Sequence, residues 1–349
     1  MIKTYLISVF VWLITYTGLL AGTWVVSNNP ENKAEFASIQ SAVEQALPGD
    51  TILVKGSPVN YGNVILEKPI TLIADIYGED NPNGHTAKLT RVLLTANPYR
   101  RSISSGSAII GFEFPYFPGQ RPNIVTISDD KALIKDVIIE KNWMWFIEIL
   151  GSAENWTFRH NIIRGWVNGS ARKGSDMSGA TNFAFHNNVI NTLKGFDRGN
   201  IHIHNNIIMG RLQDVMHASV INNIFVRDGF ILENVVQSSF QNNITYGKQI
   251  GNDQCYEHPE RFESMNSCAE LANQGSDNKV GIDPGFVYWP LKNVESVQVF
   301  QLKEGSVARK SGKKGTQAGI FGGDYPFPIH GFLKPEIDDP FPSFITSIY

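Results

Sequence analysis

The phrase FHNNVIN, at residues 185–191, recurs as IHNNIIM at 203–209, VINNIFV at 220–226 and FQNNITY at 240–246. Two looser copies precede it, FRHNIIR at 158–164 and IEKNWMW at 139–145. The second Asn of each copy serves as a reference position: Asn142, Asn161, Asn188, Asn206, Asn223 and Asn243. Successive reference positions are separated by 19, 27, 18, 17 and 20 residues. A repeat of this length is too short for a domain. It predicts one turn of a solenoid, whose turns bury their apolar faces only against one another.

The residues before each reference Asn alternate as in a strand. Side chains two positions apart in a strand point to the same face. The positions three and five residues before the reference are therefore predicted to face the core: Ile139, Phe158, Phe185, Ile203, Val220 and Phe240, and Val137, Trp156, Phe183, Ile201, Ala218 and Ser238. The strand is expected to bend at the Asn, because Asn tolerates a left-handed backbone.

Stacked Asn amides, ~4.8 Å apart, are then expected to form hydrogen bonds from turn to turn. The ladder residues are interpreted as structural rather than catalytic: Asn161, Asn188, Asn206, Asn223 and Asn243.

The segment before the repeats indicates how the coil begins. The stretch FASIQSAVEQAL at 36–47 has apolar residues at helical spacing, Pro48-Gly49-Asp50 ends it, and TILVKG, VILEKP and ITLIAD are expected strands. The phrase PGDTILVKG at 48–56, with YGNVILEKPITLI at 61–73, resembles the start of pectate-lyase-like right-handed parallel β-helix proteins. With the Asn repeats, the resemblance covers about two-thirds of the chain.

The resemblance implies an all-β fold, a right-handed single-stranded parallel β-helix with a short N-terminal capping helix and an irregular C-terminal cap. It does not identify an activity, because this fold carries lyases, hydrolases, adhesins and inert scaffolds. The sequence contains neither a WIDH-like phrase of the calcium-dependent lyases nor the NTDG…DD…GHG…RIK set of the polygalacturonases. No catalytic residue of these enzyme families is therefore assigned to this chain.

The chain is expected to be exported. Residues 1–22 join Lys3 to a long apolar run ending in small residues, the pattern of a secretory signal peptide. A membrane anchor is the alternative, although the run barely reaches spanning length and no basic cluster follows it. The predicted domains are a β-helix at 23–303, with insertions at about 164–182 and 251–279, and an irregular cap or tail at 304–349. The expected location is secreted, periplasmic or cell-surface, with no membrane span after signal cleavage.

The cysteines indicate a disulfide, and the net charge limits the classes of partner that the protein is expected to bind. Cys255 and Cys268 lie in the second insertion, and in an exported protein a disulfide between them is the leading interpretation. The net charge of −3 gives no attraction to nucleic acid or anionic membranes. No Gly-rich phosphate loop opens a helix, which argues against a nucleotide cofactor.

A patch of basic side chains is predicted on the outer face of the strands before the reference Asn. Its members are Arg159, His186, His202 and His204, with His186 and His204 expected one turn apart. The first insertion adds three further candidates for substrate binding: Trp166, Arg172 and Lys173. A solvated polar ladder, a sugar or anion site and a metal site all fit the patch.

Candidate catalytic residues come from the segments that lead into these strands: Asp176, Asp197, Arg198, Arg211 and Asp214. The three aspartates come from consecutive turns and, if stacked, could hold Ca²⁺ or act on a uronic acid. A lyase needs a base with a cation beside it, and a hydrolase needs two carboxylates. Ordinary surface charge is the alternative interpretation, and nothing in the sequence requires a cofactor.

The functional expectation is that one exterior face binds polysaccharide, with lyase-like or hydrolase-like processing as a further hypothesis. The alternative is a non-catalytic cell-surface or assembly protein, in which the coil is a rigid scaffold for a protein partner. A clustered groove of Asp, Arg and His side chains beside the first insertion, 164–182, favours the first function. A flat, apolar or featureless exterior favours the second.

Overall fold

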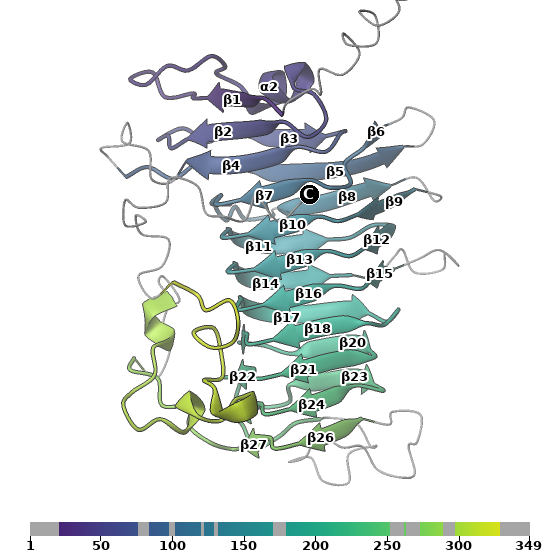
Figure 1. Ribbon diagram of the computed structural model, residues 1–349, viewed down its shortest axis with the longest axis vertical. Helices are drawn as coiled ribbons and strands as arrows, with labels where there is room; N and C mark the ends of the chain where they lie inside the picture. The colour runs from purple at the N-terminus through teal and green to yellow at the C-terminus, as the bar shows by residue number, and fades with distance from the viewer. Residues whose placement is uncertain are drawn as a thin grey trace, which may run out of the picture.

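A computed structural model describes residues 21–75, 84–97, 102–119, 122–128, 132–169, 179–251, 262, 273–288 and 297–328. Most of these residues wind into a right-handed parallel β-helix, which is a solenoid, as the repeat predicted, and the fold that the resemblance implied (Figure 1). The strands stack into sheets that run along the coil, each strand pairing with its counterparts in the neighbouring turns.

Two long sheets and one short sheet make the walls of the coil. Sheet A consists of β1 (Thr23–Val26), β2 (Thr51–Lys55), β4 (Thr71–Asp75), β7 (Ala108–Ile110), β10 (Ile138–Glu140), β13 (Thr157–Arg159), β16 (Ala184–His186), β18 (Ile201–His204), β21 (Ala218–Ile221), β24 (Ser239–Gln241) and β26 (Gln274–Ser276). Sheet B consists of β3 (Asn63–Leu66), β5 (Arg91–Asn97), β8 (Ile124–Ser128), β11 (Trp143–Glu148), β14 (Ile162–Asn168), β17 (Val189–Phe196), β19 (Ile207–Ile208), β22 (Ile224–Phe225), β25 (Ile244–Thr245) and β27 (Lys279–Val280).

Sheet B also contains β20 (Leu212–Met216), which pairs with β17, and β23 (Leu232–Val236), which pairs with β20. Sheet C consists of β9 (Leu133–Lys135), β12 (Ser152–Glu154) and β15 (Ala180–Thr181). Among the described strands, only β6 (Ser102–Ile103) runs antiparallel to its partner, β5.

A short helix covers the N-terminal end of the coil, as expected. Helix α2 (Ile39–Gln45) begins after Ser38, whose side chain accepts a hydrogen bond from the Ser41 N–H. The helix buries Ile39, Ala42 and Val43 and lies beside β1 at the end of the stack (Figure 1). It therefore shields the apolar interior at the first turns.

The interior is filled by the side chains that the alternation assigned to it. All twelve predicted core positions are buried, including Ser238, whose hydroxyl donates to the Val236 carbonyl oxygen at 2.9 Å. Four aromatic rings stack inside two consecutive turns, with centroid separations of 5.5 Å between Trp156 and Phe183 and 4.7 Å between Phe158 and Phe185. Aligned stacking of this kind is a favourable arrangement for aromatic rings.

The reference Asn residues form a continuous buried ladder, which confirms their structural interpretation. From Asn161 onward, each Oδ1 accepts hydrogen bonds from both the backbone N–H and the Nδ2 of the Asn in the preceding turn, whereas Asn142 Oδ1 accepts from the Phe112 N–H. Asn188 Oδ1, for example, lies 2.9 Å from both Asn161 atoms. Each Nδ2 also donates to a backbone carbonyl of the preceding turn, such as that of Phe158 at 2.9 Å from Asn188. The ladder continues to Asn278, beyond the predicted set.

The bend in each turn falls one residue earlier than predicted. The residue before the reference Asn, not the Asn itself, has the left-handed backbone. Its φ is 53° at Asn187, 57° at Asn205, 59° at Asn222 and 55° at Asn242. The two residues of an Asn pair therefore have separate roles, because the first makes the bend and the second makes the ladder.

The described part of the C-terminal tail, residues 297–328, lies along the flank of the coil rather than across its open end (Figure 1). It contains the short 3₁₀ helices η2 (Val297–Phe300), η3 (Val307–Arg309) and η4 (Lys313–Gly315). Its apolar side chains, with Phe286, cover an outward-facing row just after the reference Asn: Ile162, Val189, Ile207, Ile224 and Ile244. Without the tail, this outward-facing apolar row would be exposed to water. Because burying apolar surface is favourable, the tail lies along the flank.

The first Asn of several pairs holds this tail in place. Asn187 Nδ2 donates to the carbonyl oxygens of Ile320 and Gly322, at 2.8 and 2.7 Å. One turn further on, Asn205 Nδ2 donates to the Gln317 carbonyl oxygen at 3.3 Å, and in the turn after that Asn222 Oδ1 accepts from the Lys313 N–H at 2.8 Å. The Asn pairs thus link the coil to the tail as well as one turn to the next.

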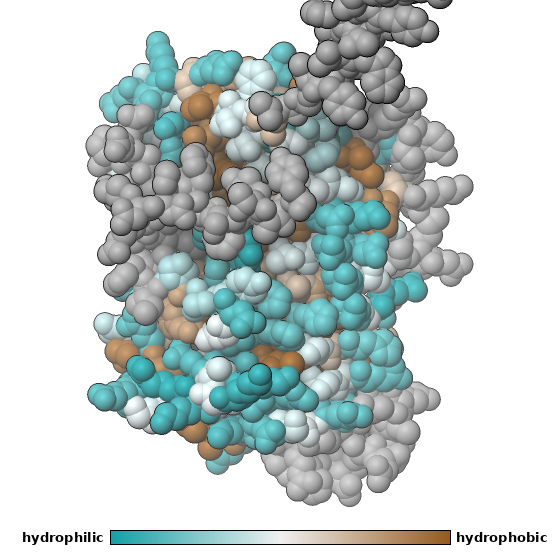
Figure 2. Space-filling view, viewed as in Figure 1, coloured by the Kyte–Doolittle hydropathy of each residue, from teal (hydrophilic) through white to brown (hydrophobic). Residues whose placement is uncertain are grey.

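The visible face of the molecule is mainly polar, with small and separate apolar patches (Figure 2). Within the described residues, no helix is long and apolar enough to cross a membrane. The predicted signal segment lies almost entirely outside the described residues, as do Cys255 and Cys268.

Candidate functional site

The structure places the predicted basic patch on the outer face of sheet A. Arg159 pairs with His186, and His186 pairs with His204 in the next turn, as the sequence predicted. The ring centroids lie 5.5 Å apart for His186 and His204 and 5.6 Å apart for His202 and His204. The patch exists as a row of neighbouring side chains.

Most of this patch is already occupied by groups of the same chain. Arg159 Nε donates to Glu140 Oε2 at 2.8 Å. The Tyr325 ring of the tail lies 6.0 Å from His186 and 5.9 Å from the Arg159 guanidinium. His204 Nε2 lies 3.2 Å from the Ser219 hydroxyl. These contacts leave little of the row open to a large ligand.

The electrostatics of the patch favour a neutral imidazole at His186 and at His204 and an ionised Glu140. Burial lowers the pKa of His204 to about 4, with neighbouring His186 and His202 acting in the same direction. Burial and His202 also lower the pKa of His186. Burial alone would raise the pKa of Glu140, but His160, Arg159 and Lys141 outweigh it and lower the pKa to about 2. His160 Nδ1 lies 3.9 Å from the carboxylate, too far for a direct hydrogen bond, so the Arg159 contact at 2.8 Å is the better-supported cause of the lowered pKa of Glu140.

The candidate catalytic residues do not meet at one point. Asp197 and Arg198 lie in the exposed turn after β17. Asp214 lies within β20 in left-handed conformation, with φ of 51°, and accepts a hydrogen bond from Asn234 Nδ2 at 2.7 Å. Because Phe196 pairs with Val215, Asp197 and Asp214 occupy different positions along their strands.

Three of the candidate residues, Asp176, Arg172 and Lys173, lie outside the described residues. Among the residues that the structure does describe, no three His, Cys, Asp or Glu side chains are arranged to hold a metal ion.

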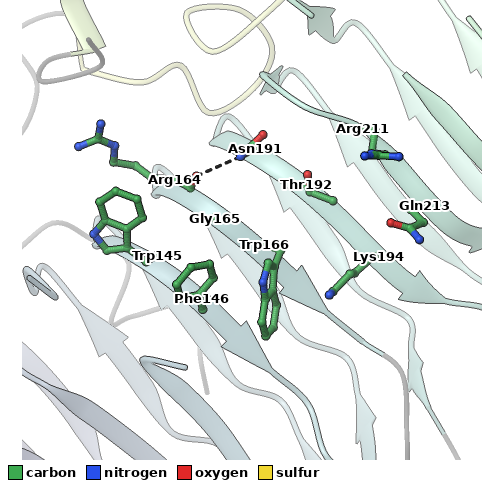
Figure 3. A pocket seen from close by; sticks show the side chains of 10 residues that line it. All are labelled: Trp145, Phe146, Arg164, Gly165, Trp166, Asn191, Thr192, Lys194, Arg211 and Gln213. Carbon is green, nitrogen blue, oxygen red and sulfur yellow. Dashed lines mark hydrogen bonds between the residues drawn. The ribbon is translucent and has the colours of Figure 1, made fainter. Parts of the chain in front are cut away.

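An open groove of about 370 Å³ lies elsewhere, on the outer face of sheet B (Figure 3). It crosses four neighbouring strands, β11, β14, β17 and β20, and therefore runs along the coil. Its lining residues are Trp145, Phe146, Arg164, Gly165, Trp166, Asn191, Thr192, Lys194, Arg211 and Gln213. Two of the predicted site residues, Trp166 and Arg211, belong to this groove.

A bulge in β14 shapes the floor of the groove. Met144 pairs with Ile163 and Phe146 with Trp166, so β14 has one residue more than β11 across this interval. The same extra residue appears against β17. A Cβ at Gly165 would overlap the Phe146 ring and the Trp145 carbonyl oxygen. Only Gly fits here, and the bulge brings Trp166 level with Phe146.

Aromatic rings and cations alternate along the groove. The Phe146 and Trp166 rings lie 5.2 Å apart, and the Lys194 ammonium lies 4.2 Å from the centre of the Trp166 ring. Trp145 lies 4.6 Å from Tyr116 and 4.8 Å from the Arg164 guanidinium. Arg211 forms an ion pair with Glu233. The groove therefore offers flat apolar surfaces beside positive charge.

The alternation of core and outward-facing positions before the reference Asn does not predict this groove, because it extends only to the first residue after that Asn. The side chains of the groove lie three to seven residues after the reference Asn, as Trp145, Arg164 and Gln213 do. The signal in the sequence was the recurrence of aromatic and basic residues there, but the bulge at Gly165 breaks the regular spacing. The strand pairing of the folded chain was needed to align these residues.

No protein-family model matches the sequence, and a comparison with curated proteins finds no match.

Proposed function

We propose that this protein binds polysaccharide in the groove on sheet B. The observation that carries the proposal is the set of aromatic side chains, Trp145, Phe146 and Trp166, on the outer face of adjacent strands. Aromatic rings offer large apolar faces that pack against the C–H faces of sugar rings, while nearby polar groups supply orientation. Four strands span three turn spacings, ~14 Å, enough for several contacts along a chain.

The chemistry of the lining supports binding more strongly than hydrolysis. Hydrolysis of a glycosidic bond requires two carboxylates on either side of it. Among the described residues that line the groove there is no Asp or Glu. Elimination on a uronic acid needs a cation and a base. If the protein breaks the chain that it binds, Lys194 and Arg211 are the lining residues suited to that reaction.

We also propose that the protein is exported and that it belongs to the pectate-lyase-like β-helix proteins. The apolar N-terminal segment supports export, and the PGDTILVKG phrase together with the parallel coil supports the relationship. A protein-binding scaffold remains the competing function. The aromatic groove favours polysaccharide over that alternative, because a scaffold has no need of aromatic rings aligned across strands, as Phe146 and Trp166 are.

A binding screen with a groove variant tests the proposal. The full chain is titrated with neutral and uronate-containing polysaccharides, and Trp166→Ala is compared with Tyr288→Ala. Tyr288 is 61% exposed and lies outside the groove, so it controls for loss of a surface aromatic. Trp166→Ala should weaken binding at least tenfold, and Tyr288→Ala should leave it unchanged. Absorbance at 235 nm and reducing ends are followed in parallel to detect elimination and hydrolysis. Equal binding by both variants would place the site elsewhere.

A further inference from the structure

Each tryptophan of the groove has both an aromatic ring and a cation as neighbours. Trp166 has Phe146 on one side, 5.2 Å away, and the Lys194 ammonium on the other, 4.2 Å away (Figure 3). Trp145 has the same two kinds of neighbour, Tyr116 at 4.6 Å and Arg164 at 4.8 Å. The arrangement repeats with a shift of one strand, because Trp145 belongs to β11 and Trp166 to β14.

The two cations cover ring surface that a sugar would use. A cation over an indole face is held by attraction to the ring and partly shields it from solvent. Among the described residues, no carboxylate lies within ion-pair distance of Lys194 or Arg164, whereas Arg211 is paired with Glu233. Lys194 and Arg164 therefore rest on rings rather than on acids.

We infer that Lys194 and Arg164 make the groove specific for acidic polysaccharide, by leaving the ring for a carboxylate of the ligand. This inference rests on the proposed polysaccharide function. A uronate chain offers both parts of the exchange, because a sugar face replaces the cation on the ring and the carboxylate becomes its new partner. Ion pairs with carboxylates supply directional hydrogen bonds as well as charge attraction.

A neutral polysaccharide supplies only half of this exchange. It displaces the cation from the ring but gives it no anionic partner, so the lost attraction opposes binding. The two side chains thus penalise neutral ligands while favouring acidic ones, which is how specificity is commonly built. Removing the charge should then change the two affinities in opposite directions.

The variant Lys194→Gln tests this sign reversal. Glutamine keeps part of the unbranched stem but loses the charge, and Lys194→Arg retains a cation able to make both contacts. Lys303→Gln changes the net charge by the same amount at an exposed residue outside the groove, and serves as the matched control. The probes are oligouronates derived from pectin and alginate, each paired with its carboxyl-reduced neutral form, and a sulfated oligosaccharide. Affinities are measured by calorimetry with the full chain.

Wild type should bind an oligouronate more tightly than its reduced form. Lys194→Gln should weaken uronate binding about three- to tenfold and strengthen binding of the reduced form about twofold, the scale of one partly exposed cation contact. Lys194→Arg should restore the wild-type pattern, and Lys303→Gln should match wild type.

Three other results would overturn the inference, and they can be told apart. If Lys194→Gln lowers both affinities or neither, the cation does not exchange partners, although the groove still binds polysaccharide. Tightest binding of the sulfated probe would reject the carboxylate as the recognised group. If wild type binds none of the probes, the proposed function fails together with the inference.

Discussion

Replacing Asn206 tests how much the buried ladder contributes to stability. Its side chain is fully buried, and its Oδ1 accepts from the Asn188 N–H at 2.9 Å. Its Nδ2 donates to Phe185 at 2.8 Å, and also to His204 and Asn223 at 3.0 Å. In Asn206→Ala the buried Asn188 N–H loses its acceptor, which costs about 1–3 kcal/mol. Four further hydrogen bonds are lost at about 0.5–1.5 kcal/mol each, namely the three that Nδ2 donates and the one that Oδ1 accepts from Asn188 Nδ2 at 3.1 Å. Together these losses amount to about 3–9 kcal/mol, so the free energy of unfolding should fall by at least about 3 kcal/mol.

The measurement is urea denaturation followed by far-ultraviolet circular dichroism, with the slope compared as well as the midpoint. Asn200→Gly is the control, because Asn200 is exposed, has φ of 59° that Gly tolerates, and donates only one solvent-facing hydrogen bond to Asn182, at 2.9 Å. That variant should lose less than about 1 kcal/mol. Equal losses in the two variants would refute the claim that burial makes the inner ladder costly to break.

Asn206→Asp separates shape from hydrogen-bond donation. The introduced carboxyl can still accept from Asn188, but as an anion it cannot donate to the Phe185 or His204 carbonyls. Burial and these acceptors should raise its pKa in the folded state above the unfolded value of ~3.9. Stability is then retained at low pH and lost as the pH rises through the folded pKa. A destabilisation independent of pH would contradict this explanation.

Three further predictions concern the outer face of sheet A and the tail. Because the folded pKa of Glu140 is about 2 against 4.5, its stabilising contribution of about 3 kcal/mol should be present above pH 4.5 and be lost as the pH falls toward 2. Glu140→Gln should remove that dependence in acid titrations of stability. The pKa of His204 is about 4 against 6.5, so the unfolded chain binds its proton first and stability should decline as the pH falls from 6.5 toward 4. His204→Gln should flatten this decline, and an unchanged slope would count against a buried neutral imidazole. Asn187→Gly keeps the bend but removes the hydrogen bonds to Ile320 and Gly322, so amide exchange in the tail should accelerate at least tenfold while the coil stays protected.

The fold could be predicted from the sequence because every turn of the coil has the same two structural requirements. A bend needs a residue that tolerates a left-handed backbone, and the buried carbonyls beside it need a donor, so Asn pairs recur. Asn278 escaped the pattern because 35 residues separate it from Asn243. The bend was placed one residue late because either Asn of a pair tolerates that backbone.

The position of the tail and the location of the groove could not be read in the same way. An apolar residue just after the Asn, such as Ile207, is equally compatible with the interior and with an outer surface covered by another segment. Trp166 and Phe146 are 20 residues apart in sequence and become neighbours only through strand pairing and the bulge at Gly165. Local patterns predict turns and cores well, whereas a site formed across strands depends on their register.

A crystal structure of the full chain with a bound oligouronate would test the central claim most directly. The account predicts a sugar ring against Trp145 or Trp166, a carboxylate paired with Lys194 or Arg164, and a chain running across β11, β14, β17 and β20. Sugar bound instead over His186 and His204 on sheet A, with an empty groove on sheet B, would contradict it.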